Sequence, residues 1–318
     1  MDVSIIIVNW NSADYVRKCV ASVLAHTQGL TYQIIVVDGA SFDGCGAMLA
    51  REHPEVHFIQ SQENVGFGRA NNLGFQSARG RNILCLNPDT ELTGNTIRVL
   101  MERLESLPGA GAVGCRVLNA DGTLQTSCIQ SFPTVLNQLL DSDFLRARFP
   151  RSRLWGTAAF LSSGNHPEVV EAVTGACVML KREVVERVGG FSPEFFMYGE
   201  DLDLCFKVRK SGQLVYYVPE TSLIHYGGSS TRKQQSSFSI VLMRHSVQQF
   251  LRMNRGVISA SLYRLMLGGS SIVRLLLILP LLLAGDRVVR HGRGSMQKWM
   301  AILRWSLGLE SWTRKYSR

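Results

Sequence analysis

Short apolar runs rich in β-branched residues alternate with helical patterns along the first 240 residues, and this alternation constrains the fold more than any other feature. Residues 3–8 (VSIIIV), 34–37 (IIVV) and 82–86 (NILCL) are three such runs. The first is followed by Ser12, a suitable N-cap for a helix. Strands that are apolar on both faces and joined by helices are typical of a mainly parallel sheet covered on both sides. The chain is therefore expected to fold as an α/β protein.

The remaining elements follow from the same patterns. Residues 128–168 lack clear periodicity and are interpreted as a long loop or insertion, and beyond residue 240 the pattern is helical throughout. Further strands are expected at residues 56–59, 111–118, 173–180 and 214–218, and further helices around residues 47–51, 182–188 and 200–210. We therefore expect two regions of different architecture.

The positive charge of the chain is concentrated in its last quarter. The net charge is +9, but residues 244–318 hold 13 lysines and arginines against the two acids Asp286 and Glu310, which leaves −2 for the rest of the chain. Such an asymmetry marks the basic segment as one that contacts an anionic partner, either a membrane or a nucleic acid. No nucleic-acid recognition motif accompanies it, so a nucleic-acid partner is not expected.

The cysteines and the first residues indicate the compartment. Seven cysteines are scattered without a CxxC pair, so neither disulfides nor a zinc site are expected. Met1-Asp2 leads directly into the first apolar run, without the basic stretch and cleavage site of a secretory signal. These features predict a protein of a reducing compartment that is not exported.

Polar side chains gather where the predicted strands end. Asn9 and Asn11 follow the first strand, Asp38 and Ser41 the second, and Asn87 and Asp89 the strand at residues 82–86. In open parallel sheets, ligands bind outside the carboxyl ends of the strands. A single aspartate there is also a common turn former or helix cap, but three strand ends with polar residues favour a binding site.

A glycine-containing loop at residues 64–72 (NVGFGRANN) precedes a helical segment. Its glycines allow backbone N–H groups to approach a phosphate or a ribose. The loop lacks the third glycine of a dinucleotide fingerprint and does not open the first βαβ unit, which disfavours a Rossmann dehydrogenase. No GxxxxGK[ST] sequence occurs, which disfavours a P-loop enzyme.

The densest group of acids is Glu200, Asp201 and Asp203, directly after Gly199. Acids in a first helical turn can simply complement the helix dipole, and for Asp203 this reading has as much support as a functional one. For Glu200 and Asp201, the bulky residues 195–198 (FFMY) would desolvate the carboxylates and raise their pKa, as a catalytic base requires.

Eight motifs occur in the order seen in family 2 glycosyltransferases, and the sequence resembles the rhamnosyltransferase-like branch of that family over roughly residues 1–235. The motifs are residues 3–11, 36–41 (VVDGAS), 63–72, 86–90 (LNPDT), 174–176 (TGA), 189–191 (GGF), 199–203 (GEDLD) and 225–229 (HYGGS). The resemblance implies a GT-A fold, a nucleotide-diphospho-sugar donor carrying dTDP, UDP or GDP, a divalent cation (Mg²⁺ or Mn²⁺) and inversion at the anomeric carbon.

The resemblance also implies roles on the donor side. Asp89 matches the last carboxylate of the family's Asp-x-Asp metal motif, whose first position is Asn87 here, and one carboxylate is adequate for Mg²⁺. His225 matches a late histidine that meets the metal or the diphosphate, although a lone histidine is also commonly structural. Arg232 and Lys233 would compensate the charge of the leaving group. The donor nucleotide would be held by Asn9, Asn11, Asp38, Ser41, Asn64, Gly66, Asn71 and Asn87.

On the acceptor side, the resemblance makes Asp201 the general base and Glu200 a residue that orients the acceptor. Gly175, Ala176, Tyr198 and Asp203 would line the acceptor site. Gly39 and Ser192 depart from the residues frequent in the family at their positions, which leaves the identity of the donor open.

These inferences predict a catalytic domain at residues 1–240, with a donor-binding half at about 1–118 and an acceptor half at about 119–240. It would transfer one sugar, rhamnose as first choice, to a glycan or polyprenyl-linked acceptor in cell-surface polysaccharide or cell-wall synthesis. One alternative is a catalytically silent nucleotide-sugar-binding protein. Another is a processive polysaccharide synthase, disfavoured because Ala301 replaces the glutamine of the Gln-x-x-Arg-Trp motif.

Residues 241–318 are expected to form a basic, Leu-rich helical region on the cytoplasmic face of a membrane. Arg264 and Arg274 interrupt the apolar stretch at residues 257–285, which favours an interfacial helix over a spanning one. In the interfacial arrangement the arginines would snorkel, and Trp299, Trp305 and Trp312 would lie at headgroup depth. A spanning helix, a helical layer packed on the catalytic domain and a homodimer contact are the alternatives.

Overall fold

The computed structural model describes residues 1–318 except 150–151, 153, 157–163, 228–236, 280–285 and 318. The chain divides into two compact units. The first, here called the sheet unit, consists of residues 1–132, 158–196 and 200–227. The second, here called the helical unit, consists of residues 133–157, 197–199 and 228–318.

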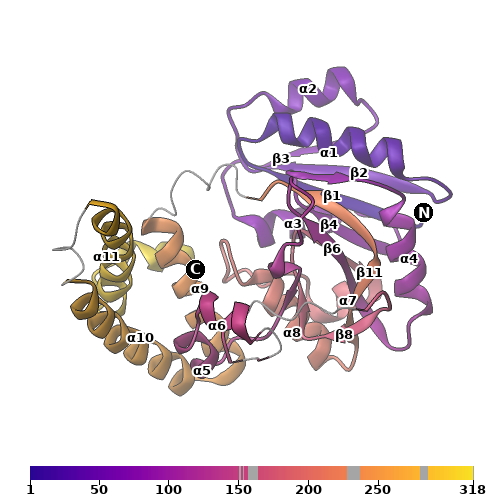
Figure 1. The fold of residues 1–318 in the computed structure, drawn as a ribbon. Coiled ribbons are helices and arrows are strands. Elements are labelled where there is room, and N and C mark those ends of the chain that lie inside the picture. The colour runs from indigo at the N-terminus through magenta and orange to yellow at the C-terminus, as the bar shows by residue number, and fades with distance from the viewer. Residues whose placement is uncertain (150–151, 153, 157–163, 228–236, 280–285, 318) are drawn as a thin grey trace. The chain divides into compact units, whose positions relative to one another are not determined.

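A mostly parallel sheet forms the centre of the sheet unit (Figure 1), in the order β3-β2-β1-β4-β10-β6-β11-β5, with β8 beside β11. Its strands are β1 (Val3–Asn9), β2 (Tyr32–Asp38), β3 (His57–Gln60), β4 (Asn82–Leu86), β5 (Thr90–Leu92), β6 (Ala110–Leu118), β8 (Glu168–Val170), β10 (Cys177–Lys181) and β11 (Leu214–His225). Strands β1 to β4 pair in parallel, whereas β10 runs antiparallel to both β4 and β6. The α/β fold with a mainly parallel sheet is therefore confirmed.

Helices cover both faces of this sheet because its central strands are apolar on both sides. On one face, helices α1 (Ala13–His26), α2 (Cys45–Glu52) and α4 (Thr96–Ser106) bury apolar residues in a common core with β1, β2 and β4. On the other face lies α3 (Phe67–Ser77), where a Cβ on Gly74 would stand 2.6 Å from Ile6 Cγ2. Helices α7 (Arg182–Val188) and α8 (Glu200–Lys210) complete the unit, and α8 packs beside α3.

The helical unit consists of α5 (Val135–Leu139), α6 (Asp143–Arg148), α9 (Ser237–Arg255), α10 (Val257–Ile278), α11 (Asp286–Ser306) and the 3₁₀ segment η3 (Ser311–Ser317). Its core is built around the buried Tyr263 of α10 and Trp305 of α11, with Val241 and Leu251 from α9. The expectation of helical structure beyond residue 240 is confirmed for the residues that are described.

The structure corrects two local expectations from the sequence and refines two others. The strand expected at residues 173–180 is two strands, β9 (Ala172–Val173) and β10, separated by residues 174–176. The stretch at 128–168 follows the 3₁₀ turn η1 (Thr126–Cys128) and contains β7 (Ile129–Gln130), α5 and α6 rather than only a loop. The last strand continues to His225, past an irregularity after Val218. Ser12 makes no side-chain cap to α1, because its hydroxyl donates to Asn9 Oδ1 instead.

Candidate active site

The ends of β1 and β2 bring the first two groups of expected residues together. Asn9 and Asp38 are neighbours in the parallel register, and Asn9 Nδ2 donates to Asp38 Oδ1 at 2.6 Å. Asn11, in the left-handed region with φ 51°, donates its backbone N–H to Ser41 Oγ at 2.9 Å. Sequence reasoning missed Asp43, whose Oδ2 accepts from Asn9 Nδ2 at 3.1 Å and from the first N–H of α1, that of Ala13, at 2.8 Å.

Asp38 is a preorganised hydrogen-bond acceptor. Its Oδ2 accepts from Ser41 N at 2.8 Å and from Gln60 Nε2 at 2.7 Å, a partner at the end of β3 that the sequence did not indicate. Burial alone would raise the pKa of Asp38, but the hydrogen bonds from Ser41, Gln60 and Asn9 together hold it below its usual value. A fixed, ionised carboxylate at this strand end can accept from a ribose hydroxyl or from an N–H of a base.

The loop at residues 64–72 contributes Asn64, which lies close to the end of β2, and Asn71, which is buried. Asn64 Oδ1 accepts from Gly66 N at 3.0 Å, and a Cβ on Gly39 would lie 3.7 Å from that same oxygen. Gly66 has φ +86°, and a Cβ there would meet the carbonyl oxygen of Phe196 at 2.2 Å, so this position requires glycine. Asn71 is fully buried on α3, where it donates to Phe67 O at 3.0 Å.

The pairing of β11 with β5 places His225 against the residues that follow β4. His225 lies opposite Thr90 in the antiparallel register. Its Nε2 is therefore 3.1 Å from Asp89 Oδ1 and 3.3 Å from Asn87 Nδ2. The structure thus joins His225 to two residues that lie 136 and 138 positions before it in the sequence.

Gln125, which sequence reasoning missed, fixes the ring of His225. Its Nε2 donates to the His225 backbone carbonyl at 2.7 Å, and its Oε1 lies 3.0 Å from His225 Nδ1. Because the backbone carbonyl can only accept, the amide nitrogen must face it, and Oε1 then accepts a hydrogen bond from Nδ1–H. Nε2 of neutral His225 consequently directs a lone pair toward Asp89 and Asn87.

This donor set fits a divalent cation. A carboxylate oxygen and an imidazole lone pair that face each other at 3.1 Å repel unless a proton or a cation lies between them. Two ligands at right angles in an octahedron, each about 2.0–2.1 Å from the metal, would be about 2.9 Å apart. No cluster of three or more His, Cys, Asp or Glu side chains suited to a metal occurs among the described residues, so protein ligands would have to be supplemented by substrate or water.

Glu200 and Asp201 form a carboxylate pair at the start of α8. Glu200 is 7% exposed, and its Oε2 has no hydrogen-bond partner in the described part of the chain. Burial, followed by the charge of Asp201, raises the pKa of Glu200 to about 8, so the group is protonated at neutral pH. Burial also raises the pKa of Asp201, although hydrogen bonds from Gly175 and Leu202 oppose the shift.

Asp201 is the more accessible and more firmly positioned member of this pair. Its Oδ2 accepts from Gly175 N at 2.9 Å and from Gln130 Nε2 at 3.2 Å, and its Oδ1 accepts from Leu202 N at 2.8 Å. A Cβ on Gly175 would lie 3.2 Å from Asp201 Cβ, so glycine permits this close approach. A desolvated, oriented and partly accessible carboxylate is suited to accepting a proton from a hydroxyl.

A short backbone path connects this carboxylate pair to the Asp89–His225 pair. Gly175 binds Asp201, and the carbonyl of the next residue, Ala176, accepts from Asn87 N at 3.0 Å. The break between β9 and β10 thus contacts both the Asp201 carboxylate and Asn87, which lies beside the Asp89–His225 pair.

The structure does not bring every expected residue to the site. Asp203 is fully buried, accepts from Ser192 Oγ at 2.6 Å and lies 3.7 Å from Lys207 Nζ, so we do not retain it as an acceptor-binding residue. Tyr198 belongs to the helical unit and has a left-handed backbone with φ 70°. Arg232 and Lys233 lie outside the described residues.

The raised pKa of Glu200 predicts a specific pH dependence of stability. Between pH 4.5 and about 8, the folded state keeps a proton that the unfolded state releases, so the free energy of unfolding should fall as pH rises through this window. Glu200→Gln mimics the neutral acid and should flatten the slope. Urea unfolding at pH 5, 6.5 and 8 measures it, and equal slopes in both proteins would contradict the pKa shift.

In its fold and in the position of its polar strand ends, the sheet unit has the architecture of a GT-A glycosyltransferase. The sequence profile described as glycosyl transferase family 2 matches residues 4–189. Because this match covers more than half of the chain, the protein belongs to glycosyl transferase family 2.

Individual relatives agree with this assignment. The chain is 26% identical over 247 residues to an N-acetylglucosaminyl-diphospho-decaprenol L-rhamnosyltransferase of Mycobacterium tuberculosis, covering 73% of this chain and 78% of the relative. It is 26% identical over 240 residues to the rhamnosyltransferase WbbL of Escherichia coli, covering 72% and 85%. Among solved structures, a mannosyltransferase of Pyrobaculum calidifontis in complex with GDP-Man and Mn²⁺ shares the fold, with a TM-score of 0.60, 16% identity and coverage of 97% and 87%.

Proposed function

We propose that the protein is an inverting, metal-dependent glycosyltransferase that moves one sugar, rhamnose as first choice, from a nucleotide-diphospho-sugar to a hydroxyl of a lipid-linked glycan acceptor. The proposal rests mainly on the backbone connection described above. Gly175 binds Asp201, the proposed proton acceptor, and Ala176 binds Asn87, which lies beside the Asp89–His225 pair. The two rhamnosyltransferase relatives support the sugar, and the name of the Mycobacterium tuberculosis relative, which includes a diphospho-decaprenol, supports a polyprenyl-diphosphate acceptor.

Different side chains of the site would bind the donor, accept the proton and hold the cation. Asp38 would hold the ribose or the base of the donor, with Asn9, Ser41 and Asn64 at the same edge. Asp201 would accept the proton of the attacking hydroxyl, and neutral Glu200 would donate a hydrogen bond that orients the acceptor. Asp89 and His225 would hold a divalent cation, which when bound supplies Lewis-acid neutralisation of the diphosphate. An imidazole ligand favours Mn²⁺ over Mg²⁺, which prefers oxygen ligands.

A screen of donors tests the substrate class. Because a ligand that binds only the folded state raises the melting temperature, dTDP-rhamnose with Mn²⁺ should raise it more than UDP-glucose or GDP-mannose does. The same donors are then tested for sugar transfer to a polyprenyl-diphosphate-linked acceptor. Stabilisation by GDP-mannose alone would contradict the dTDP-sugar assignment, and stabilisation without transfer to any acceptor would favour the catalytically silent alternative.

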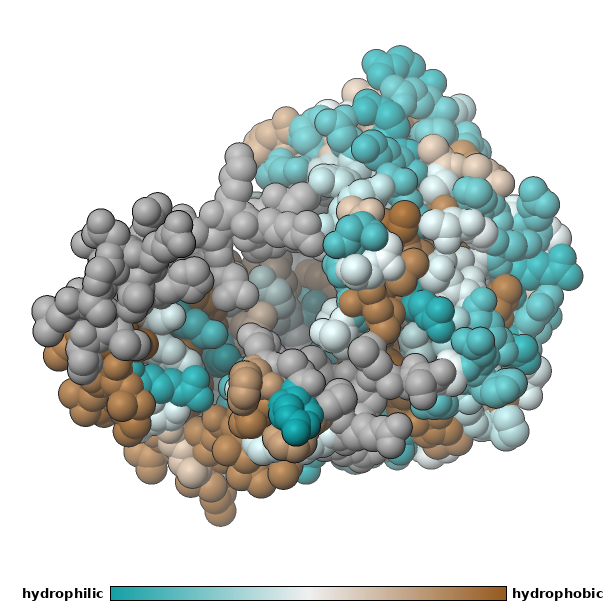
Figure 2. Space-filling model, viewed as in Figure 1, coloured by the Kyte–Doolittle hydropathy of each residue, from teal (hydrophilic) through white to brown (hydrophobic). Residues whose placement is uncertain are grey.

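We also propose that residues 241–318 hold the enzyme on the cytoplasmic face of a membrane through α10. Among the described residues, α10 is the one helix long and apolar enough to span a membrane by length and composition. One face of α10 carries exposed apolar side chains at spacings of three, four and seven residues, and Figure 2 shows this hydrophobic surface along the helix. The stripe comprises Ile258, Leu262, Leu265, Ile272 and Leu276, and Leu279 follows directly after the helix.

The structure corrects the details expected for this region. Arg264 donates to the carbonyls of Trp305 and Ser306, and Arg274 lies 4.3 Å over the ring of Trp299, so both arginines serve packing within the helical unit instead of snorkelling. Trp305 is 2% exposed and belongs to the core, and therefore does not lie at headgroup depth. The exposed stripe of α10 is consequently free of charge, which suits insertion into the acyl boundary.

Vesicle sedimentation tests the stripe. Burying one leucine contributes about 1.5–3 kcal/mol, so Leu265→Asp with Leu276→Asp should weaken binding to vesicles containing phosphatidylglycerol at least about tenfold. Val169→Asp, which changes an exposed apolar residue of β8 in the sheet unit, is the control and should bind normally. Equal sedimentation of both variants would reject α10 as the membrane contact.

A further inference from the structure

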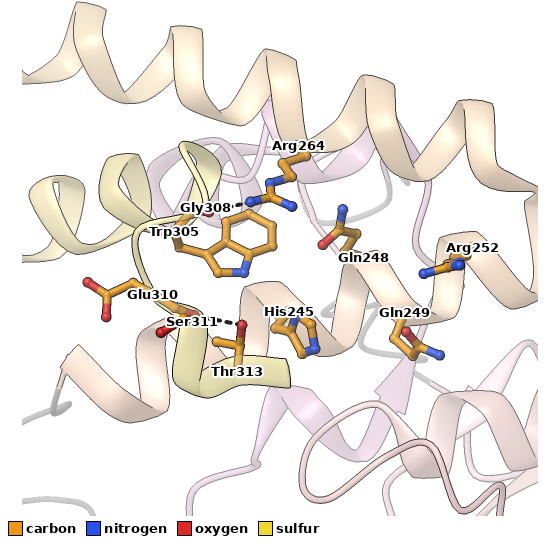
Figure 3. Close-up of a pocket in the computed structure, with 10 residues that line it drawn as sticks. All are labelled: His245, Gln248, Gln249, Arg252, Arg264, Trp305, Gly308, Glu310, Ser311 and Thr313. Carbon is orange, nitrogen blue, oxygen red and sulfur yellow. Dashed lines mark hydrogen bonds between the residues drawn. The ribbon is translucent and has the colours of Figure 1, made fainter. Parts of the chain in front are cut away.

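A cavity of about 610 Å³ lies within the helical unit, apart from the residues assigned to sugar transfer (Figure 3). One wall is a stripe of α9 formed by His245, Gln248, Gln249 and Arg252, at spacings of three and four residues. The stripe is entirely polar, and its side chains are half-buried or exposed, so it lines the cavity with hydrogen-bonding groups.

The cavity presents hydrogen-bond donors that the protein does not use. The side chains of Gln248, Gln249 and Arg252 have no hydrogen-bond partner among the described residues. Opposite them, Arg264 donates through Nε and Nη2 to the carbonyls of Ser306 and Trp305, both at 3.0 Å, which leaves its Nη1 uncommitted within the described part of the chain. In Figure 3 the side chains of Arg264 and Gln248 point into the same space.

The uncommitted charge of the cavity is positive. Its carboxylate, Glu310, already accepts from Arg304 Nε at 2.8 Å and from Trp312 Nε1 at 2.7 Å. Those hydrogen bonds hold the pKa of Glu310 below its usual value, so it stays ionised and neutralises Arg304. Burial and the nearby Arg264 lower the pKa of His245 to about 4, so this residue is neutral near pH 7. Arg252 and Arg264 therefore give the cavity a net positive charge.

We propose that this cavity binds a phosphate or diphosphate ester through Arg252, Arg264 and Gln248. Guanidinium groups recognise phosphate oxygens through paired hydrogen bonds, and amide N–H groups extend such recognition. The volume is that of an ordinary small-ligand site, which spans about 300–1,000 Å³. The phosphate can come from the headgroup of an anionic lipid, since α10 also carries the apolar stripe, or from a soluble phosphate compound.

Calorimetric titration of the full chain with inorganic pyrophosphate tests the site. The titration is run in EDTA, so that no divalent cation links pyrophosphate to Asp89 and His225. We expect binding by the unmodified protein and at least a tenfold loss of affinity in the variant that combines Arg252→Gln with Gln248→Leu. Lys315→Gln removes one exposed charge from the same unit and serves as the matched control, and Asp89→Ala should bind pyrophosphate normally.

The outcomes separate the proposal from its alternatives. Absence of pyrophosphate binding, or equal affinity in the double variant and in Lys315→Gln, overturns the site, provided that both variants keep the circular dichroism spectrum of the unmodified protein. A second measurement identifies the source of the phosphate. Weaker sedimentation of the double variant than of Lys315→Gln with phosphatidylglycerol vesicles, but not with phosphatidylcholine vesicles, assigns a lipid headgroup. Equal sedimentation with a loss confined to the pyrophosphate titration assigns a soluble ligand.

The site does not depend on sugar transfer. Pyrophosphate binding requires neither donor nor acceptor, so a failed titration leaves the glycosyltransferase proposal intact. Failure of the donor screen likewise leaves the cavity's affinity for phosphate unaffected.

Discussion

Replacing Asp201 by asparagine is expected to lower the rate of sugar transfer by about 10²–10⁴-fold while donor binding stays close to normal. The substitution keeps the shape of the side chain but removes its capacity to take the proton of the acceptor hydroxyl. Because the carboxylate accepts three hydrogen bonds from Gly175, Gln130 and Leu202, the amide turns one of its N–H groups toward a donor. Thermal unfolding of the variant must therefore be measured beside the transfer rate.

Glu200→Gln is the matched comparison for this experiment. The raised pKa makes Glu200 a neutral acid at pH 7, and glutamine preserves a neutral group that can donate a hydrogen bond. A much smaller loss of transfer is expected than for Asp201→Asn. The reverse order, with the larger loss in Glu200→Gln, would make Glu200 the base and reject the assignment of Asp201.

The elements of the sheet unit could be predicted because local composition and tertiary environment agree there. Residues 82–86 are apolar at nearly every position, and β4 is buried along its whole length. The helix expected after Ser12 buries Val16, Cys19, Val20 and Val23. The break between β9 and β10 was not predictable from the sequence. Residues 174–176 interrupt the strand because Gly175 binds Asp201 and Ala176 binds Asn87, and neither contact is visible in the local sequence.

The site was predictable only where its residues stand at strand ends. Asn9, Asp38, Asn87 and Asp89 could be named in advance because they stand at the ends of β1 and β2 or shortly after the end of β4. Gln60 also ends a strand, β3, but a lone amide there gave no sign of its contact with Asp38. Neither Gln125 nor Gln130 directly follows an expected strand, and each binds a partner from a distant part of the chain. Asp203 was the reverse case, a residue expected at the site that lies elsewhere. Its place in an acidic motif does not reveal that the side chain is buried against Ser192.

The helical unit shows a further limit of composition. The arginines within the apolar stretch argued for snorkelling, yet Arg264 binds backbone carbonyls at the end of α11 and Arg274 lies over Trp299. Both arginines point away from the exposed stripe because charged side chains can pair with carbonyls and aromatic rings inside the unit. These two arginines lower the mean hydropathy of the stretch and so argue against membrane contact. They do not, however, lie on the face of α10 that would contact the membrane.

Replacing Asp89 by alanine is expected to abolish most Mn²⁺ binding in the presence of dTDP. The side chain supplies the charged ligand of the pair, and His225 Nε2, 3.1 Å from Asp89 Oδ1, cannot offset a divalent charge by itself. Electron paramagnetic resonance of free Mn²⁺ during a titration measures the affinity directly and does not require an acceptor. His225→Ala should weaken binding through loss of the second ligand.

Gln125→Leu distinguishes a cation site from a simple Asp89–His225 contact. Leucine removes both hydrogen bonds that hold the His225 ring and its tautomer, while Asp89 and His225 themselves stay unsubstituted. Replacing a residue that hydrogen-bonds a metal-ligating histidine typically lowers metal affinity by about 10–100-fold. The expected order of Mn²⁺ affinity is therefore unmodified protein, then Gln125→Leu, then Asp89→Ala, with the exposed Asp121→Asn equal to the unmodified protein. An unchanged titration in Asp89→Ala would reject the site, because the remaining imidazole of His225 supplies no charge to hold the ion.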